Sequence, residues 1–405
     1  MAACPDGVLA SGYEFDGIGA RAIARGGAVI ADAADWTAIY WNPADLVLVR
    51  QKEAGLEAKS GFSYTKDGNS FNTGVAGNTF NKKRSVSSFL FGSVGAAIPL
   101  NPDSALGVGF YMPLLQGSRF TDWNEQNTLY HSLDYKSFAG IMVWNVSYSM
   151  KMTEKAAVGA GLDVIRGDLR TDVKADLSMP PSLALMARLG LAPAKLTKKT
   201  EAAGYGMEGV FGWHYQLSDA LSLGAVARTG SKVKLKGDST ASYAGVEEKS
   251  DMVFRLKQPP TSGVGAAWQA KKDLRLTCDL TQTYWRGFSN SLRYDKPGEL
   301  LADQENTYKW KNSYKFRAGA LWAYGERTDF MFGYAFDTPA IDKESIDFSS
   351  AIDVPMHRFT AGASRRWGPV EGTFTVLAGS GSRTTGGIHY RLSGVYGVGE
   401  VRYSF

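Results

Sequence analysis

The sequence of 405 residues lacks any run of apolar residues long enough for a membrane-spanning helix, which needs roughly 18 or more in succession. Its mean hydropathy is −0.20, so a helical membrane protein is excluded. Cysteine is also scarce, because Cys4 and Cys278 are the only two. A single disulfide between them stays open, but there is no disulfide framework. The four histidines are scattered without metal-ligand spacing, so we expect neither a metal site nor a cofactor.

Charge of one sign is missing as well. The 45 basic and 40 acidic residues give a net charge of +5 and are interspersed, without the like-charged block of about five or six that marks an interaction tail. The first residues lack the basic and apolar regions of a secretory signal peptide. Two alternatives follow from these residues: the protein is intracellular, or the signal of an exported precursor has been removed.

Glycine and aromatic residues, by contrast, are abundant. The chain contains 46 glycines, where average usage would give about 28. It also contains 20 phenylalanines, 10 tryptophans and 19 tyrosines. A chain with this composition and no long apolar run is typical of an all-β protein. The position of the aromatics decides whether that protein is soluble or embedded in a membrane.

The segment 309–324 shows most clearly how the aromatics are placed. One face carries Trp310, Tyr314, Phe316, Ala318, Ala320, Trp322 and Tyr324, and the other carries Lys309, Lys311, Ser313, Lys315 and Arg317. This alternation indicates a strand with two different faces. A strand of this length would extend about 50 Å. The usual strand has about five to six residues and extends only about 17–20 Å. We expect Trp310 at one end and Trp322 at the other to lie in the aromatic girdles of a membrane barrel.

Similar alternation recurs along the chain and predicts about fourteen strands. A soluble sandwich would bury the apolar face, whereas an outer-membrane barrel turns its aromatics outward to lipid and its polar groups into the lumen. The expected strands cover 46–64, 86–100, 104–120, 137–151, 156–175, 202–217, 221–236, 253–270, 273–288, 309–325, 328–337, 355–367, 369–379 and 388–405.

The connections between these strands fall into two classes. Short polar turns alternate with longer irregular stretches at 66–84, 121–136, 176–200, 237–252, 288–308 and 338–355. Short periplasmic turns and long extracellular loops are typical of outer-membrane barrels. The last strand ends on Phe405, with Tyr403 and Val401 on the same face, as is usual for such barrels. The sequence therefore predicts a monomeric, transmembrane antiparallel β-barrel in the bacterial outer membrane.

The N-terminal segment departs from the alternation. It contains Gly17-Ile18-Gly19-Ala20-Arg21, Ala24-Arg25-Gly26-Gly27-Ala28, Ala31-Asp32-Ala33-Ala34-Asp35 and Asn42-Pro43-Ala44-Asp45-Leu46. In this order the stretches resemble the signature of the FadL/TodX family, which are outer-membrane transporters of hydrophobic compounds. The resemblance implies that 1–45 fold as a plug, or hatch, inside a barrel formed by 46–405. It also implies that Asn42, Pro43 and Ala44 close the plug against the first strand.

The resemblance continues along the chain in the family's order. It is carried by Gly107-Val108-Gly109-Phe110-Tyr111-Met112-Pro113, Gln258-Pro259-Pro260, Thr281-Gln282-Thr283-Tyr284-Trp285 and Gly333-Tyr334-Ala335-Phe336-Asp337-Thr338-Pro339. It implies passive, ligand-gated uptake of a hydrophobic small molecule, with long-chain fatty acids favoured. Two departures, Asp45 in place of a common glycine and Leu114-Leu115 after Pro113, bear on the substrate more than on the fold.

Five cations are candidates for holding a ligand head group: Lys309, Lys311, Arg317, Arg166 and Arg170. An unpaired cation in a confined lumen is costly, and a carboxylate ligand would relieve that cost with charge-assisted hydrogen bonds. By resemblance, Lys311 falls near a family position that holds the fatty-acid head group, and the two fifth-strand arginines fall near a second. The alternative is that these cations pair with lumenal acids such as Asp163, Asp168 or Asp279 and only hold the plug.

The expected third strand contains Gly107, Gly109, Pro113 and Gly117. Proline cannot donate a ladder hydrogen bond and glycine tolerates bends, so we expect this strand to be kinked or bulged. In the family, a kink here opens the barrel wall and lets the ligand leave sideways into the bilayer. The alternative is an ordinary bulge at the barrel rim.

The connection at 176–200 contains Pro180-Pro181-Ser182, which favours the start of a helix. The apolar residues that follow could share one surface: Leu183, Met186, Leu189 and Leu191. The resemblance implies an extracellular groove that captures oily ligands. Packing of the loop on its neighbours is the alternative.

Two further interpretations of function stay open. The same mechanism could carry a neutral aromatic or alkane hydrocarbon in place of a carboxylate, or the barrel could be structural or adhesive, with a permanent plug. The basic face of 309–317 favours an amphipathic carboxylate. Enzymatic activity is not expected, because His214 and Ser218 share a strand end but nothing completes a catalytic set.

Overall fold

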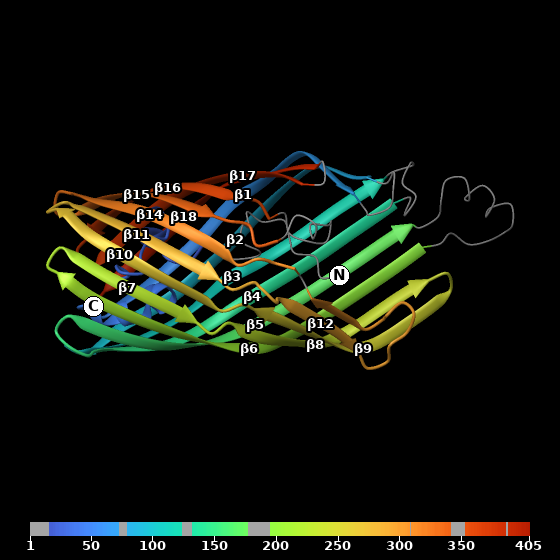
Figure 1. Ribbon diagram of the computed structural model, residues 1–405, viewed down its shortest axis with the longest axis horizontal. Coiled ribbons are helices and arrows are strands. Elements are labelled where there is room, and N and C mark those ends of the chain that lie inside the picture. The colour runs from blue at the N-terminus through green and yellow to red at the C-terminus, as the bar shows by residue number, and fades with distance from the viewer. Residues whose placement is uncertain are drawn as a thin grey trace.

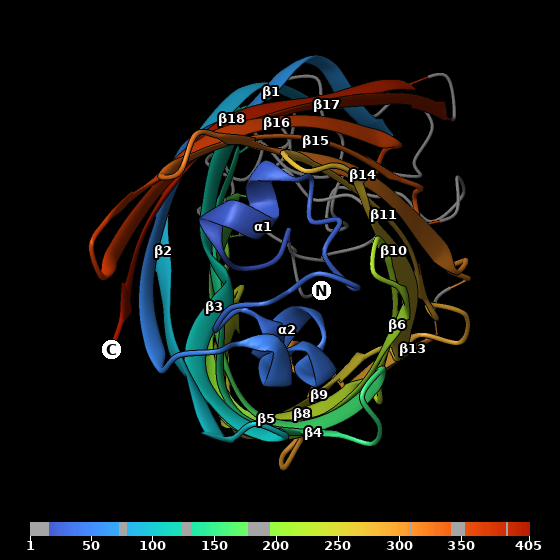
Figure 2. The same cartoon turned by 90° about the vertical axis from the view of Figure 1, so that its left-hand side faces the viewer.

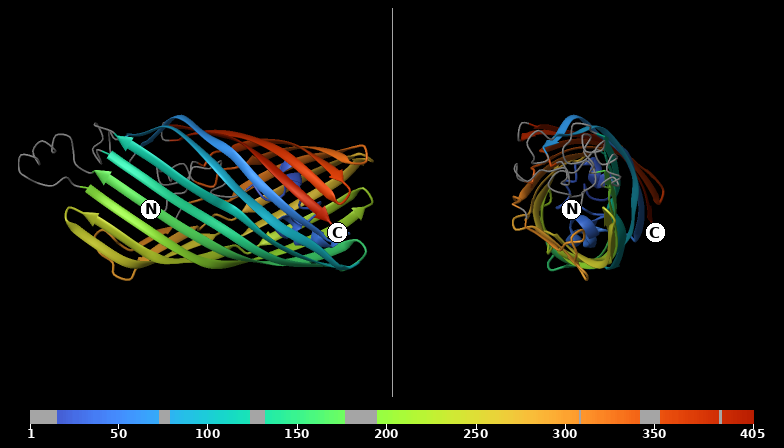
Figure 3. Two further views of the ribbon diagram at one scale, coloured as in Figure 1. Left: turned by 180° about the vertical axis from the view of Figure 1, so that it is seen from behind. Right: turned by 90° about the vertical axis from the view of Figure 1, so that its right-hand side faces the viewer.

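The computed structural model describes residues 16–72, 79–123, 132–176, 195–307, 309–341, 353–385 and 388–405. Its strands form a closed, tilted barrel (Figure 1), seen from two further sides in Figure 3. They are β1 (Glu53–Asn72), β2 (Thr79–Asn101), β3 (Ser104–Trp123), β4 (Ser132–Lys151), β5 (Ala156–Asp176), β6 (Lys195–Ser218), β7 (Leu221–Arg228), β8 (Ser231–Tyr243), β9 (Val246–Gln258), β10 (Thr261–Lys271), β11 (Leu274–Thr283), β12 (Ser289–Tyr294), β13 (Gln304–Thr307), β14 (Ser313–Tyr324), β15 (Thr328–Asp337), β16 (Met356–Trp367), β17 (Val370–Thr385) and β18 (Ile388–Ser404).

Antiparallel pairing between β1 and β18 closes the barrel. The wall has 14 positions, four of which are filled by two strands in line with a short interruption between them. These composite strands are β7 with β8, β9 with β10, β11 with β12, and β13 with β14. The predicted all-β barrel of about fourteen strands is confirmed.

The interruptions within the composite strands have local causes. Gly230, between β7 and β8, has a φ of 70°, and a Cβ there would overlap the carbonyl oxygen of Gln258. Pro259 and Pro260, between β9 and β10, cannot donate ladder hydrogen bonds. The predictions of continuous strands over 221–236 and 253–270 are therefore wrong, because the first is interrupted at Gly230 and the second at Pro259 and Pro260.

Other predicted boundaries also need correction. Part of 237–252 belongs to a hairpin of β8 and β9, turned at Ala244 and Gly245, and part of 288–308 belongs to a hairpin of β12 and β13. Neither stretch is the irregular loop that its polarity suggested. The first strand begins at Glu53 rather than at 46, because a 3₁₀-helix occupies the preceding residues.

Trp310 does not belong to an outer aromatic girdle. It is buried, and its ring lies 5.0 Å from that of Trp285 and 4.6 Å from that of Phe288, between centroids. This packing accompanies a connection at 309–312 that pairs with no strand among the described residues, so β14 begins only at Ser313. The predicted strand start at 309 is wrong.

The faces of the strands are inverted relative to those of a soluble protein. On β14, Ser313, Lys315 and Arg317 are buried, whereas Tyr314 and Phe316 are each 46% exposed. Other large apolar side chains are exposed around the wall: Trp144, Leu162, Phe211, Trp213, Val264, Trp268, Trp322, Phe332, Phe359, Phe374 and Val395. Lipid-facing apolar and lumen-facing polar residues are the arrangement of a transmembrane barrel. Among the described residues, no helix is both long and apolar enough to cross a bilayer.

Short turns join β2 to β3, β4 to β5, and β14 to β15 at one end of the barrel, where Phe405 also lies (Figure 1). Such turns face the periplasm in barrels of this kind. The opposite end is therefore the extracellular one.

Residues 16–50 lie inside the barrel (Figure 2). They form α1 (Ala20–Ala24), α2 (Ala38–Trp41) and the 3₁₀-helix η1 (Pro43–Leu48). Trp36, Ile39 and Leu46 are completely buried, in one core with wall residues such as Tyr111. The main core therefore lies between this segment and the wall.

Candidate functional site

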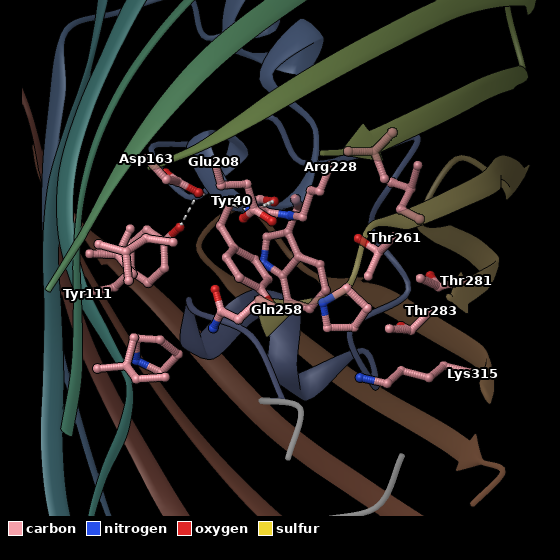
Figure 4. A pocket seen from close by; sticks show the side chains of 18 of the residues that line it. Tyr40, Tyr111, Asp163, Glu208, Arg228, Gln258, Thr261, Thr281, Thr283 and Lys315 are labelled. Atoms are coloured by element: carbon pink, nitrogen blue, oxygen red, sulfur yellow. Dashed lines mark hydrogen bonds and ion pairs between the residues drawn. The ribbon is translucent and has the colours of Figure 1, made fainter. Parts of the chain in front are cut away.

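A cavity lies between the N-terminal segment and the wall (Figure 4). The cavity has a volume of about 180 Å³. Its apolar lining includes Ile30, Trp41, Pro113, Ile141, Val143, Ile165, Val226, Pro259 and Trp285. The other eleven described residues that line it are polar or charged, so the cavity combines apolar walls with groups that can orient a small molecule.

A buried polar network forms one side of the cavity. Arg228 donates to Asp163 at 3.0 Å, to Glu208 at 2.9 Å and to the carbonyl oxygen of Tyr40 at 2.6 Å. Its guanidinium also lies 4.8 Å from the centroid of the Tyr40 ring. The Tyr111 hydroxyl donates to Asp163 at 3.0 Å. The network therefore ties β3, β5, β6 and β7 to the N-terminal segment, and its only cation is already paired twice.

The other side of the cavity carries Lys315 and Arg317 of β14, both buried. The Arg317 guanidinium lies 5.7 Å from the centroid of the Trp41 ring. In the part of the chain that the structure describes, the Arg317 side chain makes no hydrogen bond and has no carboxylate within 4.0 Å, although Asp279 is opposite it in the ladder. Its N–H groups can thus donate to a negatively charged ligand group at the edge of the cavity.

The predicted head-group cations are only partly brought together. Arg317 lines the cavity as expected. Lys309 and Lys311 do not: they lie in the exposed connection before β14, and the backbone N–H of Lys311 donates to Ala340 at 2.7 Å. Their predicted place on the lumenal face of a strand is wrong, because the ladder has not yet begun there.

Arg166 and Arg170 do not face the lumen either. On β5 the buried face carries Asp163, Ile165 and Leu169, so the two arginines share the outward face with Leu162. Arg166 pairs there with Asp168 at 3.1 Å and lies over the ring of Tyr205. The prediction that they face the lumen is wrong, because the residues of β5 that face inward are the ones directly next to them in the sequence.

The N-terminal segment is held by carboxylates of the wall that accept its backbone N–H groups. Asp279 accepts from Val29 at 2.7 Å and Ile30 at 2.9 Å, and Glu400 accepts from Ala20 at 2.6 Å. Asp279 also stands opposite Arg317 in the ladder between β11 and β14, so its charge acts on that cation, although no ion pair within 4.0 Å joins the two.

Asn42, Pro43 and Ala44 lie against the wall. The Asn42 amide donates to the carbonyl oxygens of Ile30 at 2.7 Å and Trp213 at 3.1 Å, and its oxygen accepts from Ala44 at 3.1 Å. A Cβ on Gly159 or Gly212 would collide with these three residues. They therefore contact β5 and β6, not the first strand.

Asp45 accepts from the N–H of Ala33 at 2.8 Å and lies 2.7 Å from Nδ1 of His214. Burial raises the pKa of the Asp45 carboxyl, and the hydrogen bond with His214 opposes the increase. The residue that departs from the family's usual glycine thus anchors η1 to β6.

The third strand is bulged at Pro113. Its pairing with β4 shifts register between Tyr111 and Leu114, so that Met112 and Pro113 face a single residue, Met142. Pairing with β2 stops at Ser93 and Tyr111, and beyond Tyr111 the described part of β3 pairs with β4 alone. The wall therefore lacks a hydrogen-bonded ladder between β2 and β3 above this point.

Two glycines of the third strand, Gly107 and Gly109, do not bend it. Gly107 and Gly109 sit in regular ladder positions, and a Cβ on either would collide with Ile39. They make room for the N-terminal segment. Gly117 pairs with Phe138 beyond the bulge. The four residues of the expected capture groove, Leu183, Met186, Leu189 and Leu191, lie outside the described residues, as does Cys4.

Arg228, Glu208 and Tyr111 were not singled out from the sequence. Arg228 had a signal, because it is the only charged residue of the stretch 221–228, whose only other polar residue is Ser222. Cys278 is an exposed free thiol. No group of acidic, histidine or cysteine side chains in the described ranges could hold a metal ion.

A sequence profile described as "outer membrane protein transport protein (OMPP1/FadL/TodX)" matches residues 3–365. A crystal structure of a Pseudomonas aeruginosa FadL homologue is similar with a TM-score of 0.73 and 15% identity, covering 99% of this chain and 100% of that one. The Ralstonia pickettii toluene transporter TbuX has a TM-score of 0.69 and 19% identity, covering 96% and 99%. A Neisseria meningitidis serogroup B protein, provisionally described as an outer membrane protein, is 24% identical over 88% of this chain and 82% of its own.

Proposed function

Because the chain belongs to the OMPP1/FadL/TodX family of outer-membrane transport proteins, we propose that it takes up an amphipathic long-chain carboxylate such as a fatty acid. The ligand enters from the extracellular side, binds in the cavity with its carboxylate on Arg317, and leaves sideways between β2 and β3. Residues 16–50 act as the plug that closes the lumen. The groove at 183–191 remains a prediction for the capture site.

The observation that carries the proposal is the position of Arg317. A buried cation is normally paired, whereas the Arg317 guanidinium borders the cavity with no carboxylate within 4.0 Å in the described chain, and Asp279 opposite it is engaged by two backbone N–H groups. Lys315 lines the same side. A carboxylate would satisfy Arg317 while its hydrocarbon chain lies against Ile141, Val143 and their apolar neighbours.

The lateral exit is supported by the position of the bulge. Tyr111 and Pro113 line the cavity at the height where β2 and β3 cease to pair. An oily ligand that leaves here enters the bilayer directly and avoids an aqueous outlet. The polar network at Arg228 holds the neighbouring wall to the segment, so release requires no opening of the whole barrel.

A neutral aromatic hydrocarbon is the second candidate ligand. Structures of similar fold from Pseudomonas putida and Ralstonia pickettii are named as toluene transporters. A neutral ligand would use the apolar lining and gain nothing from Arg317, so the two candidates differ in their dependence on this cation.

Replacing Arg317 with glutamine separates the candidates. Arg317→Gln should weaken oleate binding about 10- to 150-fold, as expected for a charge-assisted hydrogen bond of about 1.5–3 kcal/mol, and should leave the affinity for toluene unchanged. Isothermal titration in matched detergent measures both. Lys311→Gln, which removes an exposed cation just before the same strand, is the control and should bind oleate like the wild type. Unchanged oleate affinity in Arg317→Gln would rule out the head-group assignment.

A further inference from the structure

Five cations on the outer surface of the barrel form a second charged feature, unrelated to the lumen. They are Lys232, Lys234 and Lys236 of β8 and Arg255 and Lys257 of β9, here called the outer cationic cluster. All are exposed, and they alternate with buried residues such as Val233, Leu235 and Phe254, which face inward. The cluster therefore points away from the lumen.

The cluster places like charges directly opposite each other. In the ladder between β8 and β9, Lys232 is paired with Lys257, and Lys234 with Arg255. Such cross-strand pairs destabilise a sheet. In the described chain, no carboxylate lies within 4.0 Å of Lys232, Lys234, Lys236 or Arg255. The nearest outward acids on these strands, Asp238 and Asp251, face each other beyond Lys236. The arrangement is unfavourable for the protein alone.

The cluster begins where the apolar outer surface ends. Below the interruption, the outward face of β7 and β10 carries apolar residues such as Leu223, Val264 and Trp268; above it, β8 and β9 carry the cations. On neighbouring β6, Trp213 and Tyr205 are both exposed. They lie about 27 Å apart along the strand, or about 21 Å in height at a tilt of about 40°.

That height matches an apolar band of about 25 Å between aromatic girdles. Tyr205 is paired with Lys234 across the sheet, so the cluster lies at the extracellular edge of the band. This is the level of the head groups of the outer leaflet. A hollow with about 510 Å³ of space for water-sized molecules adjoins it, lined by Met207, Thr229, Lys232, Lys257, Tyr284 and Arg286 among others.

We propose that the outer cationic cluster binds the phosphate groups of an anionic lipid in the outer leaflet. A phosphate between Lys234 and Arg255 would accept hydrogen bonds from both and turn a repulsive pair into two attractive contacts. The hollow beside Lys232 and Lys257 has room for part of the head group. The lipid would thereby fix the depth and rotation of the barrel in the membrane.

The test uses the full-length protein in detergent with diphosphoryl lipid A as the probe, and native mass spectrometry to measure the bound fraction. Each cation near an anionic surface is worth about 1 kcal/mol, or about fivefold in affinity. The double variant Lys234→Gln/Arg255→Gln should therefore bind lipid A about 30-fold more weakly than the wild type. Dephosphorylated lipid A should bind both proteins equally weakly.

Arg327→Gln/Arg365→Gln is the matched control, because it removes two exposed cations at the periplasmic end and should bind lipid A like the wild type. Heat-modifiable mobility on gels verifies that each variant forms a barrel. If the first double variant misfolds, Lys232→Gln/Lys236→Gln replaces it with the same expectation. Retained affinity in the cluster variant, or an equal loss in the control, overturns the proposal. Displacement of lipid A by an equal concentration of inorganic phosphate would also overturn it, since the site would then bind free phosphate.

Discussion

At the scale of single residues, glycines on the inner face allow the N-terminal segment to fit. Trp36 is completely buried, and its indole occupies the space where a Cβ on Gly55 or Gly95 would stand. Its N–H donates to Glu400 at 2.8 Å. One aromatic side chain thus contacts β1, β2 and β18, and only glycine leaves room for it.

Gly55→Ala should loosen the segment, because the added methyl group overlaps the Trp36 ring. Overpacking of this kind costs about 1–3 kcal/mol. Hydrogen exchange of the amides at 33–41, followed by mass spectrometry, should be faster in the variant. The control is Gly399→Ala on β18, where a Cβ would meet nothing within 4 Å. Equal exchange in Gly55→Ala and the control would contradict the role given to Trp36.

At the scale of elements, irregularities of the strands determine where the wall is weak. Two residues of β3 face one residue of β4 at Pro113, and the β2–β3 ladder ends beside this bulge. Near the opposite end of the cavity, Gln258 and Pro259 line both the cavity and the outer hollow at the break between β9 and β10. Proline and extra residues thus mark both places where the ladder stops.

Deletion of Pro113 should straighten β3, because a single residue would then face Met142. The side chains before and after the deletion would keep their inward or outward orientation. If ligand leaves through this gap, oleate uptake by cells should fall to the level of cells without the protein, while oleate binding in detergent persists. Pro113→Ala keeps the extra residue and should retain uptake. Full uptake by the deletion variant would argue against lateral exit at β3.

At the scale of the whole molecule, the charges inside the barrel belong mainly to contacts with the N-terminal segment. Wall acids in these contacts are Glu53, Glu57, Asp279, Asp329, Glu371 and Glu400, and wall cations are Lys59, Arg228, Arg275, Arg317, Arg358 and Arg402. The inward face of the wall around the segment and the cavity also carries Asp163, Glu208, Asp337 and Lys315, so nine acids stand against seven cations there among the described residues.

Removal of residues 1–50 should leave a conducting barrel that prefers cations, since the uncovered wall is acidic and a ring of carboxylates selects for cations. Reversal potentials across planar bilayers in a potassium chloride gradient measure the preference. Glu53→Gln/Glu400→Gln in the truncated chain should reduce it. An anion-selective pore would contradict the charge assignment, and a non-conducting one would show that residues beyond the segment close the lumen.

Much of this architecture was predictable from local pattern. Alternation along 309–324 correctly separated Lys315 and Arg317 from Tyr314 and Phe316. The same alternation places Arg166 outside, since it shares a face with Leu162 and Val164, whereas the family resemblance implies a lumenal position. The capture groove, the plug function and the sideways exit remain predictions.

The sequence by itself determined the class of protein, because a period of two in polarity is a local property that each strand carries alone. It also determined the family, through short stretches in a fixed order. Only the tertiary structure decided which charges meet. Arg228, Asp163 and Glu208 are distant in sequence and come together through the register of β5, β6 and β7. It also decided that Arg317, and not Lys311, faces the cavity. That outcome depends on where β14 begins. The strand starts after Trp310, which is buried against Trp285 and Phe288. No local pattern in the sequence encodes this start.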